Sequence, residues 1–151
     1  MIAGYIKQYK KILEDSIIFL NEYDLFKYKN YNSSFEIVSI LLIIYFKINT
    51  FGKKLDYNKI NDHLISLFIN DLDESLRQKG IGDMSIGKYV KSYVKKFYFR
   101  LKKFPKNYDF KNIEDLNDYM NIVYSLKENK FIDFSIRIND KYNEIKKSYL
   151  T

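Results

Sequence analysis

Residues 61–104 read NDHLISLFINDLDESLRQKGIGDMSIGKYVKSYVKKFYFRLKKF, and this stretch predicts two helices joined by a tight turn. On both sides of Gly80, apolar side chains recur every three or four residues, which is typical of amphipathic helices. We expect the first helix to cover residues 56–79 and to end where Gly80 adopts the left-handed conformation. The second helix should begin at Asp83 or Ser85.

The second helix has an apolar stripe on one face and should stop at Pro105, which cannot donate a helical hydrogen bond. The glycines before it do not form a phosphate-binding loop, because the segment lacks a preceding strand and the lysine-containing ending of such loops. We interpret residues 80–83 as a helix-to-helix turn with Asp83 as the N-cap. The stripe consists of Ile86, Val90, Tyr93, Phe97, Leu101 and Phe104.

Two further helices are predicted on the N-terminal side. Ser33 and Glu36 have the spacing of a capping box, so one helix should begin there and run toward Lys47. This helix is apolar almost all round, which predicts a central, buried position. The other helix should end near Tyr23, and its apolar stripe is Ile2, Ile6, Tyr9, Leu13, Ile17 and Leu20.

Two more helices are predicted after Pro105. Asn112 and Asp115 should open one of them, with apolar residues Leu116, Met120, Val123 and Tyr124. The last has one apolar face made of Phe131, Phe134, Ile138, Tyr142, Ile145 and Tyr149. Hairpin signals and sustained alternation are missing, so strands are not expected. We therefore predict an all-α fold, a single domain over residues 1–151 with about six packed helices.

Composition narrows the class of protein. A hydrophobic content of 46% and an aromatic content of 18% exclude a disordered chain. There is no cysteine, which excludes disulfides, a thiolate nucleophile and cysteine-ligated zinc. The longest apolar run, residues 37–46, is about half of the roughly 20 residues that a membrane span needs, and residues 1–20 mix charges with apolar residues. We expect neither a transmembrane helix nor a signal peptide.

The net charge of +7 favours phosphate-rich partners such as nucleic acid, a ribosome or an anionic membrane. Part of this basicity is attributable to an AT-rich genome, because lysine, asparagine and isoleucine abound while alanine and proline each occur once. Residue types that an AT-rich genome tends to replace are informative at the positions where they remain. Arginine occurs only at Arg77, Arg100 and Arg137, and three of the five glycines are Gly80, Gly82 and Gly87.

Residues 34–104 contain FEIVSILLIIYFK followed by the helix-turn-helix stretch, and they resemble the ubiquinol-cytochrome c chaperone family. In that family an apolar helix precedes a D-x-x-L-R-E-x-G-V-G-D turn and a helix ending in F-Y-G-R. The matching positions are Asp73, Leu76, Arg77, Gly80, Gly82, Asp83, Phe97, Tyr98 and Arg100. Gln78, Ile81 and Phe99 depart from the pattern, and Phe99 prevents the close backbone approach that a glycine would permit.

The resemblance implies a fold of packed helices and a non-enzymatic role: binding newly made cytochrome b during assembly of ubiquinol-cytochrome c reductase. In mitochondrial members the role that the resemblance implies includes binding to a small partner subunit and to the ribosome. It also implies a location on the cytoplasmic or mitochondrial matrix side, peripheral to the inner membrane, with no cofactor.

On a helical wheel the second helix of the signature carries a lysine face opposite its apolar stripe. This face consists of Lys88, Lys91, Lys95 and Lys102, with Phe99 among them. One interpretation is a plain solvated surface with a single exposed aromatic. The other is a docking surface on which the lysines steer the protein to an acidic or phosphate-bearing partner and Phe99 anchors the contact.

Arg100 falls within the apolar arc of the same helix, where an unpaired guanidinium would be too costly to bury. We predict an inter-helix ion pair with Asp71 as the first candidate partner and Asp83 as the second. Asp73 lies two residues from Asp71 on another helix face, so these carboxylates do not converge. Arg77 falls on the polar arc and should be a surface residue.

No catalytic or metal-binding set of residues is recognisable. The one histidine, His63, falls on a polar arc with no second histidine or cysteine to complete a site, so we expect a surface residue. The alternative function is that of a small basic nucleic-acid- or ribosome-binding protein. The lysine face lacks the polar base-reading residues of a recognition helix, so specific nucleic-acid binding is not expected.

Overall fold

A computed structural model describes residues 4–51, 57–104, 117–123 and 126–150, and these residues are helical apart from short connections. The all-α prediction is confirmed. Five helices have 19 to 22 residues and one has six. They are α1 (Gly4–Glu22), α2 (Tyr31–Phe51), α3 (Tyr57–Gln78), α4 (Asp83–Lys103), α5 (Asn117–Ile122) and α6 (Phe131–Leu150).

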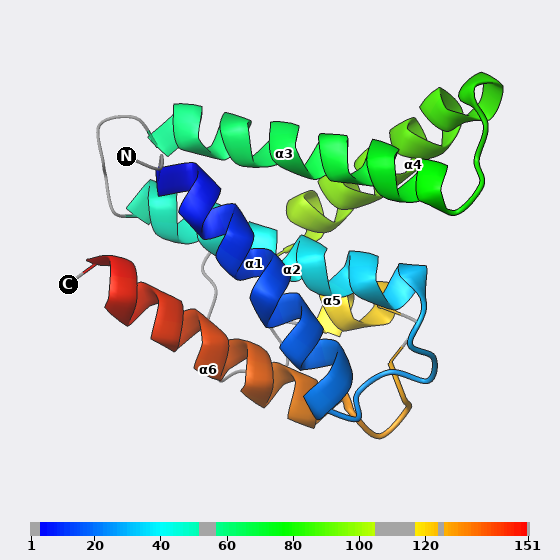
Figure 1. Cartoon of the computed structure of the whole chain (residues 1–151). Helices are drawn as coiled ribbons and strands as arrows, with labels where there is room; N and C mark the ends of the chain where they lie inside the picture. The colour runs from blue at the N-terminus through cyan, green and yellow to red at the C-terminus, as the bar shows by residue number, and fades with distance from the viewer. Residues whose placement is uncertain (1–3, 52–56, 105–116, 124–125, 151) are drawn as a thin grey trace.

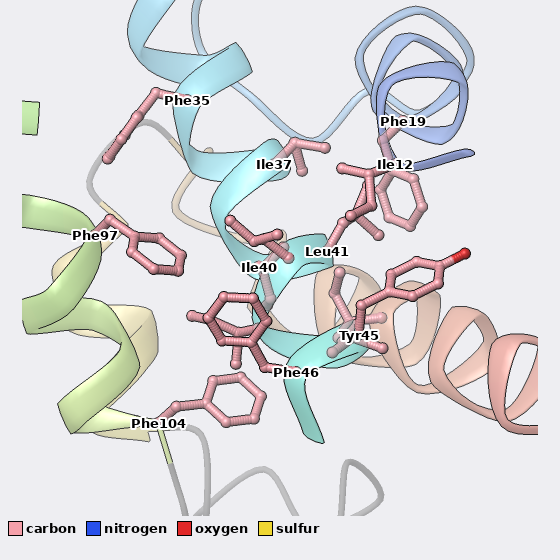
Figure 2. Packing of buried hydrophobic residues seen from close by; sticks show 14 of the residues in the cluster. Ile12, Phe19, Phe35, Ile37, Ile40, Leu41, Tyr45, Phe46, Phe97 and Phe104 are labelled. Carbon is pink, nitrogen blue, oxygen red and sulfur yellow. The ribbon is translucent and has the colours of Figure 1, made fainter. Parts of the chain in front are cut away.

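Helix α2 is the centre of the molecule, as its apolar surface predicts. The core includes side chains from all six helices, and Figure 2 shows Ile37 directed toward α1 while Phe46 lies toward α4. By length and composition Tyr31–Thr50 could cross a membrane, but 78% of its apolar window is buried inside the protein. The helices that cover it supply the apolar surroundings that a bilayer would otherwise supply.

The other helices lie on different sides of α2. Figure 1 shows α1 and α6 on one side, while α3 and α4 form a hairpin whose turn projects away from the core. The N-terminal ends of α1 and α3 lie near each other, and the two helices then diverge over the N-terminal half of α2. A groove lies between these two helices and α2.

Helix α1 is rotated relative to the predicted stripe. Tyr9 is buried as expected, but the predicted core residues Ile6, Leu13 and Ile17 are exposed. Polar residues take their place: Gln8 and Asn49 exchange two amide hydrogen bonds of 2.9 Å, and Asp15 forms ion pairs with Lys11 and Lys141. The residues of α1 that are buried are Gln8, Tyr9, Ile12, Asp15, Ser16 and Phe19.

The start of α2 also differs from the prediction. Asn30 caps the helix, since its side-chain oxygen accepts a 3.1 Å hydrogen bond from the Ser33 amide. The predicted capping box is therefore wrong. Ser33, three residues after the cap, is buried. Glu36 is also buried, and it forms an ion pair with an arginine of α4.

The C-terminal helices agree in part with the sequence analysis. Phe134, Ile138 and Ile145 of α6 are buried, whereas the predicted core residue Phe131 is exposed. Tyr119 of α5 is completely buried although the sequence analysis did not select it. Pro105, Asn112, Asp115, Leu116 and Tyr124 lie outside the described residues, as do Ile2 and the side chains of Met120 and Tyr149.

The turn between α3 and α4 has the predicted left-handed glycine. Gly80 has a φ of +98°, its amide donates to the Arg77 carbonyl, and the Ile81 amide donates to the Leu76 carbonyl. These two bonds form a Schellman motif, which satisfies carbonyls at the end of α3. The N-cap of α4 is Gly82, not Asp83 as predicted, and Asp83 is the first helical residue.

The glycines of the hairpin should respond to alanine in opposite directions. Gly80→Ala should destabilise the protein by about 1–2 kcal/mol, because only glycine adopts a positive φ without steric cost. Gly87→Ala should stabilise it by roughly 0.5–1 kcal/mol, because Gly87 is inside a helix and an added Cβ meets no atom within 4 Å. Urea denaturation of both variants measures the difference. Equal free energies of unfolding would contradict the assigned turn.

Candidate functional site

The first part of the family signature, residues 73–83, lies at the projecting end of the α3–α4 hairpin. Arg77 is exposed, as predicted, and its Nε donates a 2.6 Å hydrogen bond to Asp73 on the same helix. Its Nη1 donates to Asp83 at the start of α4. The hydrogen bond to Asp73 raises the pKa of Arg77 most, and the hydrogen bond to Asp83 raises it further. Arg77 thus links the end of one helix to the beginning of the next, and the charges of Arg77 and Asp83 lie at the helix ends that favour them.

Phe97 and Tyr98 are neighbours in sequence with different surroundings. Phe97 is 1% exposed and packs with ring-centroid distances of 6.0 Å to Phe46 and 5.3 Å to Phe68. Tyr98 is 48% exposed. Of these two signature aromatics, only Phe97 holds α4 against α2 and α3.

Arg100 is 2% exposed, which confirms its predicted burial, but its partner is Glu36 of α2. The Arg100 Nε donates a 2.9 Å hydrogen bond to Glu36 Oε2, and Nη2 forms an ion pair with Oε1. A further 3.2 Å bond runs from Nη1 to the Lys96 carbonyl. The guanidinium therefore connects α4 to the central helix through Glu36, which is neither of the two predicted partners.

Both predicted partners of Arg100 are engaged elsewhere. Asp71 accepts a 2.6 Å hydrogen bond from the Tyr9 hydroxyl, and Asp83 pairs with Arg77. Glu36 was missed because its position three residues after Ser33 suggested a cap. The signal that remained was its location on a helix face that is otherwise apolar.

Burial changes the ionisation of Glu36. Desolvation raises the pKa of Glu36, and the hydrogen bond and charge of Arg100 only partly offset that effect. Tyr119 is completely buried, and burial raises its pKa well above the ordinary value, with the Glu36 charge acting in the same direction. The phenol therefore stays neutral.

The predicted lysine face is exposed along α4, and Phe99 is 48% exposed within it. Lys88, Lys91, Lys95 and Lys102 have no ion pair recorded among the described residues. A groove of about 500 Å³ between α4 and α5 includes Lys95, Lys96 and Phe99. The binding role of this face stays a prediction.

Two residues at the hairpin end extend that exposed face. Met84 is fully exposed, and Gly87 lies one turn further along α4 with open space around it. Helical spacing places both residues on the side that carries Lys88 and Lys91. Gly87 is one of the glycines expected to be informative, whereas no prediction was made for Met84.

His63 is exposed as predicted, and its ring stacks on Tyr5 with centroids 4.3 Å apart. Within the ranges that the structure describes, no group of three or more histidine, cysteine, aspartate or glutamate residues is arranged to hold a metal ion.

Comparison with known proteins identifies the family. The family model for ubiquinol-cytochrome c chaperones matches residues 27–120, more than half of the chain and the part that contains α2, α3 and α4. No curated protein and no solved structure matches the sequence. The chain therefore belongs to the ubiquinol-cytochrome c chaperone family, and this membership indicates a chaperone, and so non-enzymatic, role in the assembly of ubiquinol-cytochrome c reductase.

Proposed function

We propose that this protein holds newly made cytochrome b while ubiquinol-cytochrome c reductase is assembled. The observation that carries the proposal is the family match over residues 27–120. That match includes the central helix, the hairpin and its turn, which form one packed unit through Phe97 and the Arg100–Glu36 pair. A rigid scaffold of this kind can present a binding surface at little entropic cost.

We further propose that the protein acts on the cytoplasmic or matrix side, peripheral to the inner membrane. The lysine face of α4 would orient it toward a phosphate-bearing or acidic surface, such as an anionic membrane or a ribosome. Association with a small partner subunit, as in mitochondrial relatives, belongs to the same proposal.

The direct test is a pull-down of the tagged protein from native membranes during active synthesis of cytochrome b. We expect cytochrome b to be enriched and the enrichment to disappear when its synthesis is blocked. An unrelated tagged helical protein of similar charge is the control. Normal assembly of the reductase in cells that lack this protein, together with no enrichment of cytochrome b, would refute the proposal.

Reversing two charges of the lysine face should impair association without unfolding the protein. Lys91→Glu with Lys95→Glu should change the free energy of unfolding by at most about 0.5 kcal/mol per site, because both side chains are exposed. Binding to anionic vesicles or ribosomes should weaken and lose much of its salt dependence. Flotation and sedimentation at two salt concentrations measure the effect.

Lys59→Glu with Lys146→Glu is the matched control, since it changes the net charge equally at exposed positions away from α4. Phe99→Ala should mainly increase the dissociation rate. If both double variants behave alike, net charge alone accounts for association and the α4 face is a plain solvated surface.

The lysine face also supports one alternative, a small basic protein that binds ribosomal or other nucleic acid. Such binding would depend steeply on salt and would persist without cytochrome b. An electrophoretic shift with RNA at increasing salt, run beside the pull-down, separates the two functions.

A further inference from the structure

The divergence of α1 from α3 leaves a groove of about 390 Å³ over the N-terminal half of α2, here called the α1–α3 groove. Its surface is mainly apolar and aromatic. Helix α2 supplies Tyr31, Ser34, Phe35 and Val38. Helix α1 supplies Tyr9 and Leu13, and the side formed by α3 includes Phe68, Asp71, Leu72 and Glu74.

The groove differs from the rest of the surface in the sign of its charge. The chain has 26 basic and 19 acidic residues, yet the charged residues that line the groove are Asp71 and Glu74. Three other grooves each include lysines, for example Lys95 between α4 and α5, although one of them also includes Glu14 and Glu144. The groove therefore favours an occupant that carries a positive charge.

Tyr9 holds the Asp71 carboxylate in position. The Tyr9 hydroxyl donates a 2.6 Å hydrogen bond to Asp71 Oδ2, which directs the carboxylate at the groove. Burial and this hydrogen bond raise the pKa of Tyr9, so the phenol remains a donor at physiological pH. Tyr31 is held in a similar way by a 2.8 Å hydrogen bond with Ser75. Asp71 and the two tyrosines of the groove are thus preorganised.

One aromatic ring of the groove is already in contact with a cation. The Lys79 ammonium lies 5.0 Å from the centroid of the Tyr31 ring, a distance at which a cation is attracted to the ring face. Lys79 is exposed and belongs to the turn after α3. A partner cation that bound the same ring face would take the place of Lys79.

The groove continues along α1 as a row of exposed apolar side chains. Ile6, Leu13 and Ile17 are 43%, 36% and 59% exposed and fall on one side of the helix, with Leu13 also lining the groove. From Ile6 to Ile17 the row extends about 16 Å at 1.5 Å per residue. That length suits a peptide segment of several residues rather than a single small molecule.

We propose that the α1–α3 groove binds an apolar peptide segment that carries one lysine or arginine side chain. Apolar residues of the segment would cover the α1 row and the aromatic floor, and its cation would lie between Asp71 and Glu74 near Tyr31. This inference rests on the proposed holding function, because it states the chemistry of the segment that is held. A charge-assisted contact to two carboxylates in a partly desolvated groove provides the selectivity.

The test measures peptide binding to the full chain. The probe is a ten-residue, end-capped peptide of leucine, isoleucine and serine with one central arginine, and the matched probe carries citrulline, which is similar in shape but neutral. We expect the arginine peptide to bind about tenfold or more tightly, because a charged hydrogen bond contributes more than a neutral one. Asp71→Asn with Glu74→Gln should abolish that preference.

Two further variants distinguish loss of the cation site from misfolding and from a general effect of charge. Glu74 is exposed, so Glu74→Gln alone removes one charge without changing the Tyr9–Asp71 bond and should lower the preference by itself. Glu22→Gln with Asp140→Asn makes the same charge change at exposed positions outside the groove and should leave the preference intact. Melting curves check that each variant is folded.

Equal binding of the two peptides to the parent protein would overturn the proposal, as would a preference that survives Asp71→Asn with Glu74→Gln. Saturable binding of monomeric dodecylphosphocholine in place of the peptide would assign the groove to a lipid and also overturn it. A dimer in sedimentation that Leu13→Glu dissociates would assign the groove to a second copy. If any of these results is found while cytochrome b is still pulled down, the groove inference fails and the proposed function stands.

Discussion

Replacing Arg100 by alanine should lower the free energy of unfolding by about 3–5 kcal/mol, because it leaves the Glu36 carboxylate buried without its cation. For a chain of 151 residues this corresponds to a fall in melting temperature of roughly 6–20 °C. Urea unfolding followed by circular dichroism measures it. Arg77→Ala is the matched control, since this arginine forms exposed ion pairs and should change stability little.

Removing both charges should restore much of the loss. Arg100→Met with Glu36→Met takes away the desolvation cost of two ions, and buried ion pairs are often no more stabilising than apolar residues of similar volume. The double variant should therefore unfold nearer the parent than Arg100→Ala does. An Arg100→Ala protein that melts like the parent would show that the pair has no role in holding α4 on α2.

The effect of Arg100 should also depend on pH. Burial raises the pKa of Glu36 and Arg100 partly offsets the rise, so removing Arg100 raises that pKa further. A carboxyl with a raised folded-state pKa contributes stability below its ordinary value of 4.5 and loses it as pH rises through the folded value. Arg100→Met should thus be less destabilising near pH 4.5 than at pH 8, as parallel urea titrations would show. A constant difference would contradict this coupling.

Phe97→Ala should be as damaging as loss of Arg100, with an expected cost of about 3–5 kcal/mol. The ring is 1% exposed and packs against Phe46 and Phe68, so its removal leaves a cavity between α2, α3 and α4. Tyr98→Ala, at the next residue of the same helix, should cost far less because Tyr98 is 48% exposed. Thermal and urea unfolding of both variants test this contrast.

The comparison separates two roles within one short signature. If Phe97→Ala destabilises the protein and Tyr98→Ala does not, the first residue serves the fold and the second is available to a partner. Comparable losses from the two variants would contradict the orientation of α4. A loss of cytochrome b from pull-downs with stably folded Tyr98→Ala would add Tyr98 to the proposed binding surface.

The helices themselves were predictable because local interactions determine them. The apolar residues of α4 recur with a helical period, and Phe97 and Phe104 are buried where that period places them. Gly80 ends α3 with a positive φ, as a glycine after an amphipathic run predicts. The all-round apolar surface of α2 likewise predicted its central position.

Periodicity did not determine which side of α1 is buried. The stripe that contains Ile6, Leu13 and Ile17 is the more apolar one, yet α1 packs with Ile12 and Phe19 against α2. Gln8 can be buried only because Asn49, on another helix, pairs with its amide. A one-dimensional pattern contains no record of such a partner, so it assigns polar residues to the surface.

Long-range pairing also made one part of the candidate site, the partner of Arg100, unpredictable from the sequence. The burial of Arg100 follows from its place on the α4 wheel, and so does its need for a carboxylate. The identity of that carboxylate depends on how α4 crosses α2, and the crossing brings Glu36, 64 residues earlier in the chain, to 2.9 Å from the guanidinium. Glu36, Asp71 and Asp83 are chemically equivalent candidates until the helices are placed in space.

The α1–α3 groove is the clearest example of a feature that the sequence alone does not predict. Family membership and the helical class could be inferred from residues 34–104 because they depend on local spacing and residue type. The groove depends on the angle between α1 and α3, which brings Tyr9 within hydrogen-bonding distance of Asp71, 62 positions away. Packing of whole helices sets that angle, and no local segment of the chain encodes it alone, so the groove and its acidic lining emerge only in the folded protein.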